Sequence, residues 1–257
     1  MSMSMPLKPL KWYKELADRK SRLAAGAFLV EGDRAIRQII ASRPSDVIEI
    51  VAAAEPPPEL QSYPLRLVTE SQLHAVSQTR TPQGIVAVVR LPVEACSGEL
   101  PPHPGDKVLL LEDIQDPGNV GTLVRTAAAF DYSGVILSEK CADPFAPKCV
   151  QAAAGTVLSL WLRRAENYLG LAGQLRDSGY FLVAAELGGR EEPSVLRRGK
   201  LLLALGNEGA GLSPSLLGAA DYRLRIPVTR EKAESLNVAA CGAICMYLSC
   251  RDAAGTS

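Results

Sequence analysis

The chain has 257 residues, enough to bury the cores of two small domains or of one large α/β domain. Its 28 lysines and arginines are balanced by 28 aspartates and glutamates, so net charge does not indicate nucleic-acid binding, although a basic patch on one domain could supply it. No apolar segment reaches transmembrane length without charges or helix breakers, and the first residues lack the apolar region of a signal peptide. We therefore expect a cytoplasmic protein without a membrane anchor.

The first feature along the chain is a basic stretch, expected to form a helix. It carries two acidic residues, Glu15 and Asp18, against six cations: Lys8, Lys11, Lys14, Arg19, Lys20 and Arg22. A run of charge is more often a solvated helix face than a binding surface. Both interpretations stay open at this point.

A small α/β domain is predicted to follow the basic helix. A short strand should lead directly into a helix over residues 27–42, and a second, shorter helix is expected at 70–78. Apolar runs bounded by turn residues predict three more strands, at 47–53, 64–69 and 84–91. Residues 91–106 are rich in proline and glycine and lack apolar periodicity, as is typical of a linker. We therefore expect domains at 1–92 and 106–257, joined by a linker at 93–105.

After the linker, short apolar runs alternate with helical patterns. Strands are expected at residues 107–114, 134–138, 180–187, 200–206 and 222–228, with helices between them at 119–130, 147–155, 169–179, 213–220 and 234–249. Strands that are apolar throughout are buried on both faces, which predicts a parallel sheet between helices. Ligands of such sheets bind at the carboxyl ends of strands, so the turns after Ile114, Leu205 and Val228 are the candidate site.

Each turn contains polar or glycine residues that have an ordinary structural explanation. In the first, Asn119 could cap the next helix and Arg125 could be a surface residue. The second has three glycines around Glu208, but it is neither a Walker loop nor a dinucleotide fingerprint. In the third, Ser235 and Asn237 stand at the start of an alanine-rich helix, where such residues are more often caps than catalysts.

The cysteines do not suggest a metal site. The chain has no CxxC pair and only two histidines, so zinc is not expected. Cys241 and Cys245 lie one helical turn apart in an apolar run, which predicts reduced, buried thiols.

Taken together, the three turns resemble one family. The segments DPGNVGTLVRTAAAF (116–130), LGNEGAGLS (205–213) and IPV…AESLNVAACGAICMY (226–247) are similar, in this order, to the three motifs of the SpoU (TrmH-type) branch of the SPOUT RNA methyltransferases. The similarity covers about residues 107–250, and 19–40 with 79–89 resemble the substrate-binding domain of rRNA-modifying members. Two positions depart from the family pattern: Asp131 replaces a usual glycine, and the loop at 227–235 lacks a glycine often found there.

The resemblance implies a fold, a reaction and a cofactor. The fold would be an α/β knot, in which the C-terminal part of a parallel-sheet domain is threaded into a deep trefoil, preceded by a small L30e-like α/β RNA-binding domain. The reaction would be methyl transfer from S-adenosylmethionine (AdoMet) to a ribose 2′-hydroxyl of rRNA or tRNA, by a homodimer that needs no metal. Motif matching assigns the cofactor to Leu205, Gly206, Gly211, Ile226, Leu236 and Asn237.

The same motif match assigns five catalytic residues: Asn119, Arg125, Glu208, Ser235 and Asn237. Family proposals make the arginine a general base, but a guanidinium stays protonated in proteins. We therefore expect Arg125 to bind phosphate and stabilise the developing alkoxide, while Glu208 orients Arg125 or Asn119. In an RNA methyltransferase the N-terminal cations would be RNA contacts, which assigns Lys11, Lys14, Arg19, Lys20 and Arg22.

Two other classes of function are considered. A relative that binds RNA without catalysis would not be expected to keep all five catalytic residues. A nucleotide-dependent oxidoreductase is disfavoured because the chain has no dinucleotide fingerprint.

Overall fold

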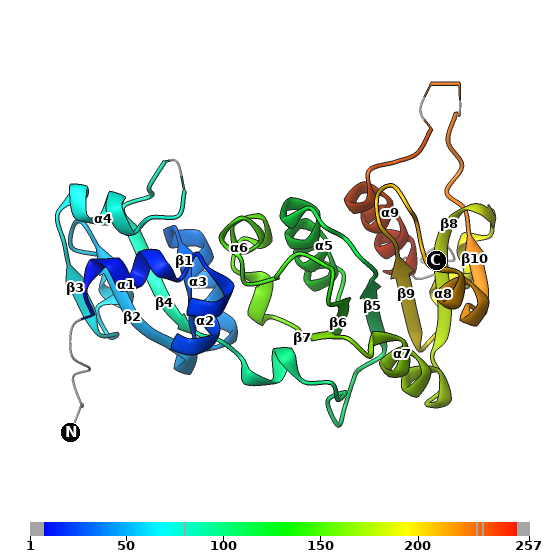
Figure 1. The fold of residues 1–257 in the computed structure, drawn as a ribbon, viewed down its shortest axis with the longest axis horizontal. Helices are drawn as coiled ribbons and strands as arrows, with labels where there is room; N and C mark the ends of the chain where they lie inside the picture. The colour runs from blue at the N-terminus through cyan, green and yellow to red at the C-terminus, as the bar shows by residue number, and fades with distance from the viewer. Residues whose placement is uncertain (1–7, 80, 230, 233, 251–257) are drawn as a thin grey trace, which may run out of the picture. The chain divides into compact units, whose positions relative to one another are not determined.

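The computed structural model describes residues 8–79, 81–229, 231–232 and 234–250, and the chain divides into two compact units. The first unit comprises residues 1–93 with 143–159, and the second comprises 94–142 with 160–257. Figure 1 shows the elements of each unit. Residues 143–159, expected in the second domain, cluster with the first unit. The predicted domain boundaries at 92 and 106 stay a prediction.

The first unit is built on a four-stranded sheet with the order β1–β4–β2–β3. Its strands are β1 (Ala27–Glu31), β2 (Val47–Ala52), β3 (Leu65–Leu67) and β4 (Ile85–Arg90). β4 is antiparallel to both of its neighbours, whereas β2 and β3 are parallel. β1 and β4 are buried along nearly their whole length, which explains their continuously apolar sequences.

Five helices complete the first unit. They are α1 (Leu10–Glu15), α2 (Arg19–Ala25), α3 (Asp33–Ser42), α4 (Glu70–Val76) and α6 (Pro147–Ala153). The sequence predicts one basic helix at the N-terminus, but the structure has two, because the Asp18 side chain accepts a hydrogen bond from Ser21 N and caps α2. Tyr13 and Leu16 are buried in the core that α1 shares with α4 and the sheet.

The second unit is built on a six-stranded sheet with the order β10–β8–β9–β5–β6–β7, in which every pairing is parallel. Its strands are β5 (Lys107–Leu111), β6 (Gly134–Ser138), β7 (Trp161–Ala165), β8 (Phe181–Arg190), β9 (Leu201–Leu205) and β10 (Tyr222–Leu224). The predicted parallel sheet is therefore confirmed, with one strand more than the sequence predicts.

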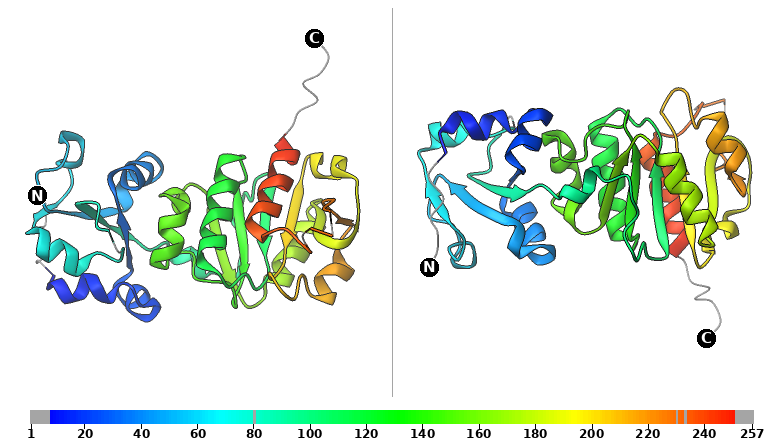
Figure 2. Two further views of the ribbon diagram at one scale, coloured as in Figure 1. Left: turned by 90° about the horizontal axis from the view of Figure 1, so that it is seen from above. Right: turned by 60° about the horizontal axis from the view of Figure 1, so that its bottom comes forward.

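Helices cover both faces of this sheet. They are α5 (Pro117–Ala129), α7 (Tyr168–Asp177), α8 (Pro214–Ala219) and α9 (Val238–Cys250). Figure 2 shows α5 and α9 side by side on one face and α7 on the other. Val108 and Leu110 face α7 and α8, and since side chains alternate along a strand, Leu109 and Leu111 face the opposite layer. No helix among the described residues is long and apolar enough to cross a bilayer.

The strand that the sequence analysis misses is β7. It contains two adjacent arginines, which conceal its strand character. Both guanidinium groups donate to backbone carbonyls: Arg163 to Glu99 and Leu162, and Arg164 to Cys141 and Glu139. As an edge strand, β7 tolerates these residues because one of its sides has no neighbouring strand.

Candidate active site

Neighbouring strands bring the first two motif turns together at the carboxyl edge of the six-stranded sheet. β5 and β9 pair with Leu111 opposite Leu205, and Glu112 N donates to the Leu205 carbonyl oxygen at 2.9 Å. The turns that leave these strands therefore begin side by side. This is the position at which parallel sheets bind their ligands.

Three polar side chains, one from each motif, form a continuous hydrogen-bonded chain. Asn119 Nδ2 donates to Glu208 Oε1 at 2.8 Å, and Asn119 Oδ1 accepts from Asn237 Nδ2 at 3.1 Å. Because a carboxylate only accepts, the contact with Glu208 determines which end of the Asn119 amide faces Asn237. Partners 89 and 118 positions away thus hold this amide in one orientation.

The interpretation of Asn119 as a helix cap is wrong. α5 begins at Pro117, and its cap is Asp116, whose Oδ1 accepts from the backbone N of Asn119 at 2.8 Å. The Asn119 side chain is consequently available for contacts outside its own helix. The expected cap at the start of α9 is Asn237, whose Oδ1 accepts from Ala239 N at 2.9 Å and Ala240 N at 3.2 Å.

The second motif forms a tight loop held by its own backbone and by Asn207. The backbones of Asn207 and Gly211 exchange two hydrogen bonds, of 3.1 and 3.0 Å, and Gly211 has a φ of 71°. A Cβ on Gly206 would lie only 2.3 Å from the carbonyl carbon of Gly211. Gly206 is therefore required by the close approach of the loop to itself. Asn207 Nδ2 also donates to the Asp113 carbonyl at 2.8 Å, joining this loop to the first turn.

A buried carboxylate below the loop provides a second connection between the two turns. Glu112 is 3% exposed and accepts from the backbone N of Ser213 at 2.6 Å, from the Ser213 hydroxyl at 2.7 Å and from the Tyr168 hydroxyl. Burial, followed by the hydrogen bond to Glu112, raises the pKa of Tyr168. The sequence analysis does not identify Glu112 as a site residue, although an acid directly after four buried strand residues is a signal for one.

The second and third motif loops enclose a cavity of about 540 Å³. It is lined by five of the six predicted cofactor residues: Leu205, Gly206, Gly211, Ile226 and Leu236. The sixth, Asn237, does not line it, because its side chain turns to Asn119 and to the start of α9. A cavity of this volume is in the range that holds one small-molecule ligand.

The charges around this cavity suit a cation. Its described lining residues include three carboxylates, Glu186, Glu208 and Glu234, and no lysine, arginine or histidine. Glu186 Oε2 is buried without a hydrogen bond among the described residues, and Arg223 Nη1 lies 4.0 Å away. Buried polar atoms normally have a hydrogen-bond partner, so a ligand donor at Glu186 is expected. AdoMet has a net positive charge, because its sulfonium and amino groups outweigh its one carboxylate, and its amino group and ribose hydroxyls can donate to Glu186.

The remaining predicted catalytic residues lie apart from the hydrogen-bonded chain. Ser235 is exposed and lines the cavity. Arg125 is exposed on α5, and its side chain makes no hydrogen bond or ion pair within the described part of the chain. The structure thus pairs Glu208 with Asn119, one of the two partners expected for it, and leaves the Arg125 guanidinium facing solvent. Arg230 and Ala233, in the third loop, lie outside the described residues.

Of the three cysteines on α9, Cys241 lines the cavity. Cys245 is buried, whereas Cys241 is half-buried and is a cavity-lining residue. The hydrogen bond between the two thiols lowers the pKa of Cys241, and this bond together with burial raises the pKa of Cys245. Across the described residues, no three potential metal ligands from histidine, cysteine, aspartate and glutamate come together.

The N-terminal cations are divided between surface and interior. Lys11, Lys14, Arg19 and Lys20 are exposed, and Lys11 Nζ lies 3.5 Å from Glu15. Arg22, predicted on the same surface, is only 2% exposed. Its guanidinium donates to the carbonyl oxygens of Leu16 and Ala17 and to Asp143 Oδ2 at 2.6 Å. These partners occupy Arg22, so we no longer assign it to RNA.

Comparison with known proteins places the chain in a family. Residues 106–247 match the model of the SpoU rRNA methylase family. The chain belongs to this family. Residues 8–87 match the MRM3-like substrate binding domain. The chain is 33% identical over 242 residues to the 23S rRNA (guanosine(2553)-2′-O)-methyltransferase RlmP of Bacillus subtilis, covering 93% of this chain and 94% of the relative.

Solved structures of similar proteins share this fold along most of the chain, including the residues of both units. An AdoMet-bound rRNA methyltransferase from Sinorhizobium meliloti is 26% identical, with a TM-score of 0.81 and coverage of 93% of each chain. The SpoU methyltransferase AviRb from Streptomyces viridochromogenes is 25% identical, with a TM-score of 0.79 and coverage of 93% of this chain and 95% of that one.

This SpoU family member is an AdoMet-dependent RNA 2′-O-ribose methyltransferase. The family, fold class, reaction and cofactor that the sequence predicts are confirmed. The trefoil knot, the homodimer and the roles of individual residues stay predictions.

Proposed function

We propose that the RNA substrate is 23S-type ribosomal RNA and that the methylated group is one of its ribose 2′-hydroxyls. The main support is the similarity to RlmP, a 23S rRNA methyltransferase, along nearly the whole of both chains. The match of residues 8–87 to a substrate-binding domain adds support, because it extends the similarity beyond the methyl-transfer unit. Ribosomal RNA as substrate also favours the predicted cytoplasmic location.

The target is tested by mapping ribose methylation across total RNA from cells with and without the gene. We expect one 2′-O-methyl group to disappear from the large-subunit rRNA and to return when the gene is restored. Loss of a methyl group from tRNA alone would contradict the proposal and would favour the tRNA alternative that the sequence leaves open.

Cofactor binding is assigned to the cavity between the second and third motif loops. Backbone groups around Gly206 and Ile226 would hold the adenosine part, and Glu186 would accept a hydrogen bond from a hydroxyl or amino group of the ligand. When bound, AdoMet supplies an electrophilic methyl group on a sulfonium. The carboxylates Glu186, Glu208 and Glu234 would favour binding of that positive charge.

Asn119 and Arg125 are assigned to the RNA. Asn119 uses one N–H for Glu208 and one lone pair for Asn237, so it keeps one donor and one acceptor for a ribose hydroxyl. Arg125 presents an exposed planar cation to the adjacent phosphate and to the developing alkoxide. The hydroxyl proton passes to phosphate or water, because a guanidinium does not act as a simple base.

Glu208 is a positioning residue in this scheme, since its carboxylate holds the Asn119 amide. Ser235 provides a hydroxyl at the cavity wall. Precise alignment of the reacting groups contributes roughly 7–11 kcal/mol in favourable cases, so the rigidity of this arrangement matters more than any proton-transfer group.

The active form is proposed to be a homodimer. α9 exposes two large apolar side chains, Ile244 at 38% and Tyr247 at 49%, and the Tyr247 ring lies 6.1 Å from that of Phe130. A second copy of the chain would cover this surface. Light scattering on the purified protein tests the proposal, and a monomer at micromolar concentration would contradict it.

A further inference from the structure

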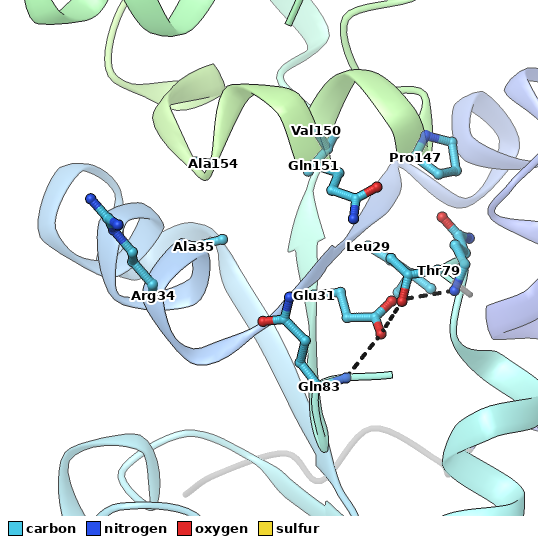
Figure 3. Close-up of a pocket in the computed structure, with 11 residues that line it drawn as sticks. Leu29, Glu31, Arg34, Ala35, Thr79, Gln83, Pro147, Val150, Gln151 and Ala154 are labelled. Carbon is cyan, nitrogen blue, oxygen red and sulfur yellow. Dashed lines mark hydrogen bonds between the residues drawn. The ribbon is translucent and has the colours of Figure 1, made fainter. Parts of the chain in front are cut away.

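The first unit contains a second cavity, remote in sequence from all three motifs. It has a volume of about 180 Å³ and is bordered by β1, the start of α3, Gln78, Thr79 and Gln83, and α6. Figure 3 shows Gln151 projecting from α6 toward the same space as Glu31 and Thr79, with Arg34 at one side. Most of the lining residues belong to the stretch 8–87 that matches a substrate-binding domain.

The floor of this pocket is held in place by one carboxylate. Glu31 accepts from the hydroxyls of Ser77 and Thr79 at 2.8 Å each and from the backbone N of Gln78 and Gln83 at 3.3 and 3.4 Å. Its lone pairs are therefore committed to shaping the segment that follows α4. Both oxygens of Glu31 thus accept hydrogen bonds from the protein itself.

The amides around this floor are not committed in the same way. Gln78 Nε2 is buried without a hydrogen-bond partner among the described residues. An unmet buried donor is destabilising, so a ligand acceptor at this position is favoured. Arg34 is exposed beside the pocket and has no ion pair within the described residues. Leu29, Val150 and Pro147 add apolar wall against which a flat ring can pack.

Size and chemistry together limit the ligand. At about 180 Å³ the pocket is below the roughly 300–1,000 Å³ range of drug-sized ligands, so it suits a single ring system rather than a whole nucleotide cofactor. Amide side chains offer paired donors and acceptors, as do the edges of nucleobases. Sequence-specific RNA recognition commonly takes an unstacked base into such a site.

We propose that this pocket binds one unstacked base of the RNA substrate, with Gln78 and Gln151 contacting its edge and Arg34 contacting the neighbouring phosphate. The inference rests on the proposed function, because it assumes that RNA is the substrate. It assigns base recognition to a surface distinct from the exposed N-terminal lysines, which contact only the backbone.

The test measures binding of the full-length protein to seven-unit ribose-phosphate oligomers that are abasic except for one central base. We expect the oligomers with a central base to bind about tenfold more tightly than the fully abasic oligomer, or roughly 1.4 kcal/mol. The Q151W variant fills the pocket mouth from an exposed position and should abolish the difference.

The matched control is Q38W, which places the same ring on an exposed position of α3 outside the pocket lining. It should keep the difference between base-containing and abasic oligomers. Equal binding of base-containing and abasic oligomers by the unsubstituted protein, or a difference that survives in Q151W, would overturn the proposal. AdoMet binding by calorimetry should be unchanged in Q151W, and methyl transfer to rRNA should show a higher KM at similar kcat. Absence of methyl transfer by the unsubstituted enzyme would instead count against the proposed function.

Discussion

The two units use their carboxylates in opposite ways. In the second unit, Glu186, Glu208 and Glu234 line the large cavity, whose described lining contains no cationic side chain. In the first unit, Glu31 is the carboxylate among the described lining residues of the small cavity; donors from its own chain surround it, and the unit's described lysines are exposed. We propose that the first arrangement suits the positively charged cofactor and the second suits RNA, although the net charge of the chain is zero.

The largest effect is expected at Arg125, the basic residue that follows Asn119 on α5 of the second unit. Arg125→Ala should lower kcat by about 10²–10³, the usual loss for one electrostatic group at a transition state, with AdoMet affinity nearly unchanged. Arg125→Lys should fail as well, because a point charge does not reproduce the planar fork. Single-turnover assays and calorimetry measure the two quantities.

Arg197→Ala is the control for this prediction, since Arg197 is exposed and lies outside the three motifs. A variant at Arg125 that loses AdoMet while still binding RNA would contradict the assignment of this residue to the substrate.

The next effect concerns the orientation of Asn119. Asn119→Asp would place two carboxylates at the 2.8 Å contact with Glu208 and should reduce methyl transfer by about 10² near neutral pH. The repulsion raises the pKa of the introduced carboxyl, which then donates to Glu208 only when protonated. The methyl-transfer activity of Asn119→Asp should therefore rise as pH falls and decline as pH rises. An enzyme that depends on a deprotonated general base shows the opposite pH dependence.

The double variant Asn119→Asp/Glu208→Gln supplies the rescue, because the glutamine amide donates to the new carboxylate. It should recover activity at neutral pH and lose the inverted pH profile. Equal inactivity of the single and double variants at every pH would show that the contact is not needed for catalysis.

A smaller effect is expected at Gly206, where the loop packs on its own backbone. Gly206→Val should weaken AdoMet binding by about 10- to 100-fold, corresponding to an overpacking cost of roughly 1–3 kcal/mol. Gly199→Val is the comparison, because a Cβ there would meet nothing within 4 Å and Gly199 lies outside the cavity lining. Similar AdoMet affinities for the two variants would contradict the role given to Gly206.

The smallest effect is expected on the basic surface of the first unit. Replacing Lys11, Lys14 and Lys20 together by alanine should weaken RNA binding several-fold at physiological salt. It should also reduce the slope of log affinity against log salt by roughly 2–3, or 0.7–0.9 per phosphate contact. The triple change to arginine preserves the charges and should leave the slope unaltered. A slope that is the same with alanine would make the cluster a solubilising surface.

Sequence patterns predict the parts of this molecule whose signals are local. Continuous apolar runs locate the central strands, and the glycine-rich second motif locates a tight loop. Local sequence patterns do not predict a residue's secondary structure or burial where tertiary contacts determine them. Arg163 and Arg164 lie in a strand because backbone carbonyls accept from them, and Arg22 is buried because two carbonyls and Asp143 surround its guanidinium.

The site follows the same rule. The three turns are predictable from their residues, but the pairing of Asn119 with Glu208 and Asn237 depends on strand order, which no local pattern encodes. The N-cap of α5 is misassigned because both Asp116 and Asn119 suit the position, and only the observed start at Pro117 decides between them. Glu112 is overlooked although it directly follows four buried strand residues, and Glu186 is overlooked because a single acid within a strand is not distinctive.

The strand order also has a consequence for synthesis of the protein on the ribosome. β5 is the first strand of its sheet to be synthesised, yet one of its two neighbours is β9, which is made much later. Likewise, Asn119 can form its hydrogen bond to Glu208 only after 89 more residues have been added. At translation rates of about 5–20 residues per second, this interval lasts roughly 5–20 s. During that time one edge of the Val108–Leu111 strand is unpaired, and an unpaired apolar edge makes the nascent chain prone to aggregate. The rate of chain elongation also sets the earliest time at which the enzyme can become active.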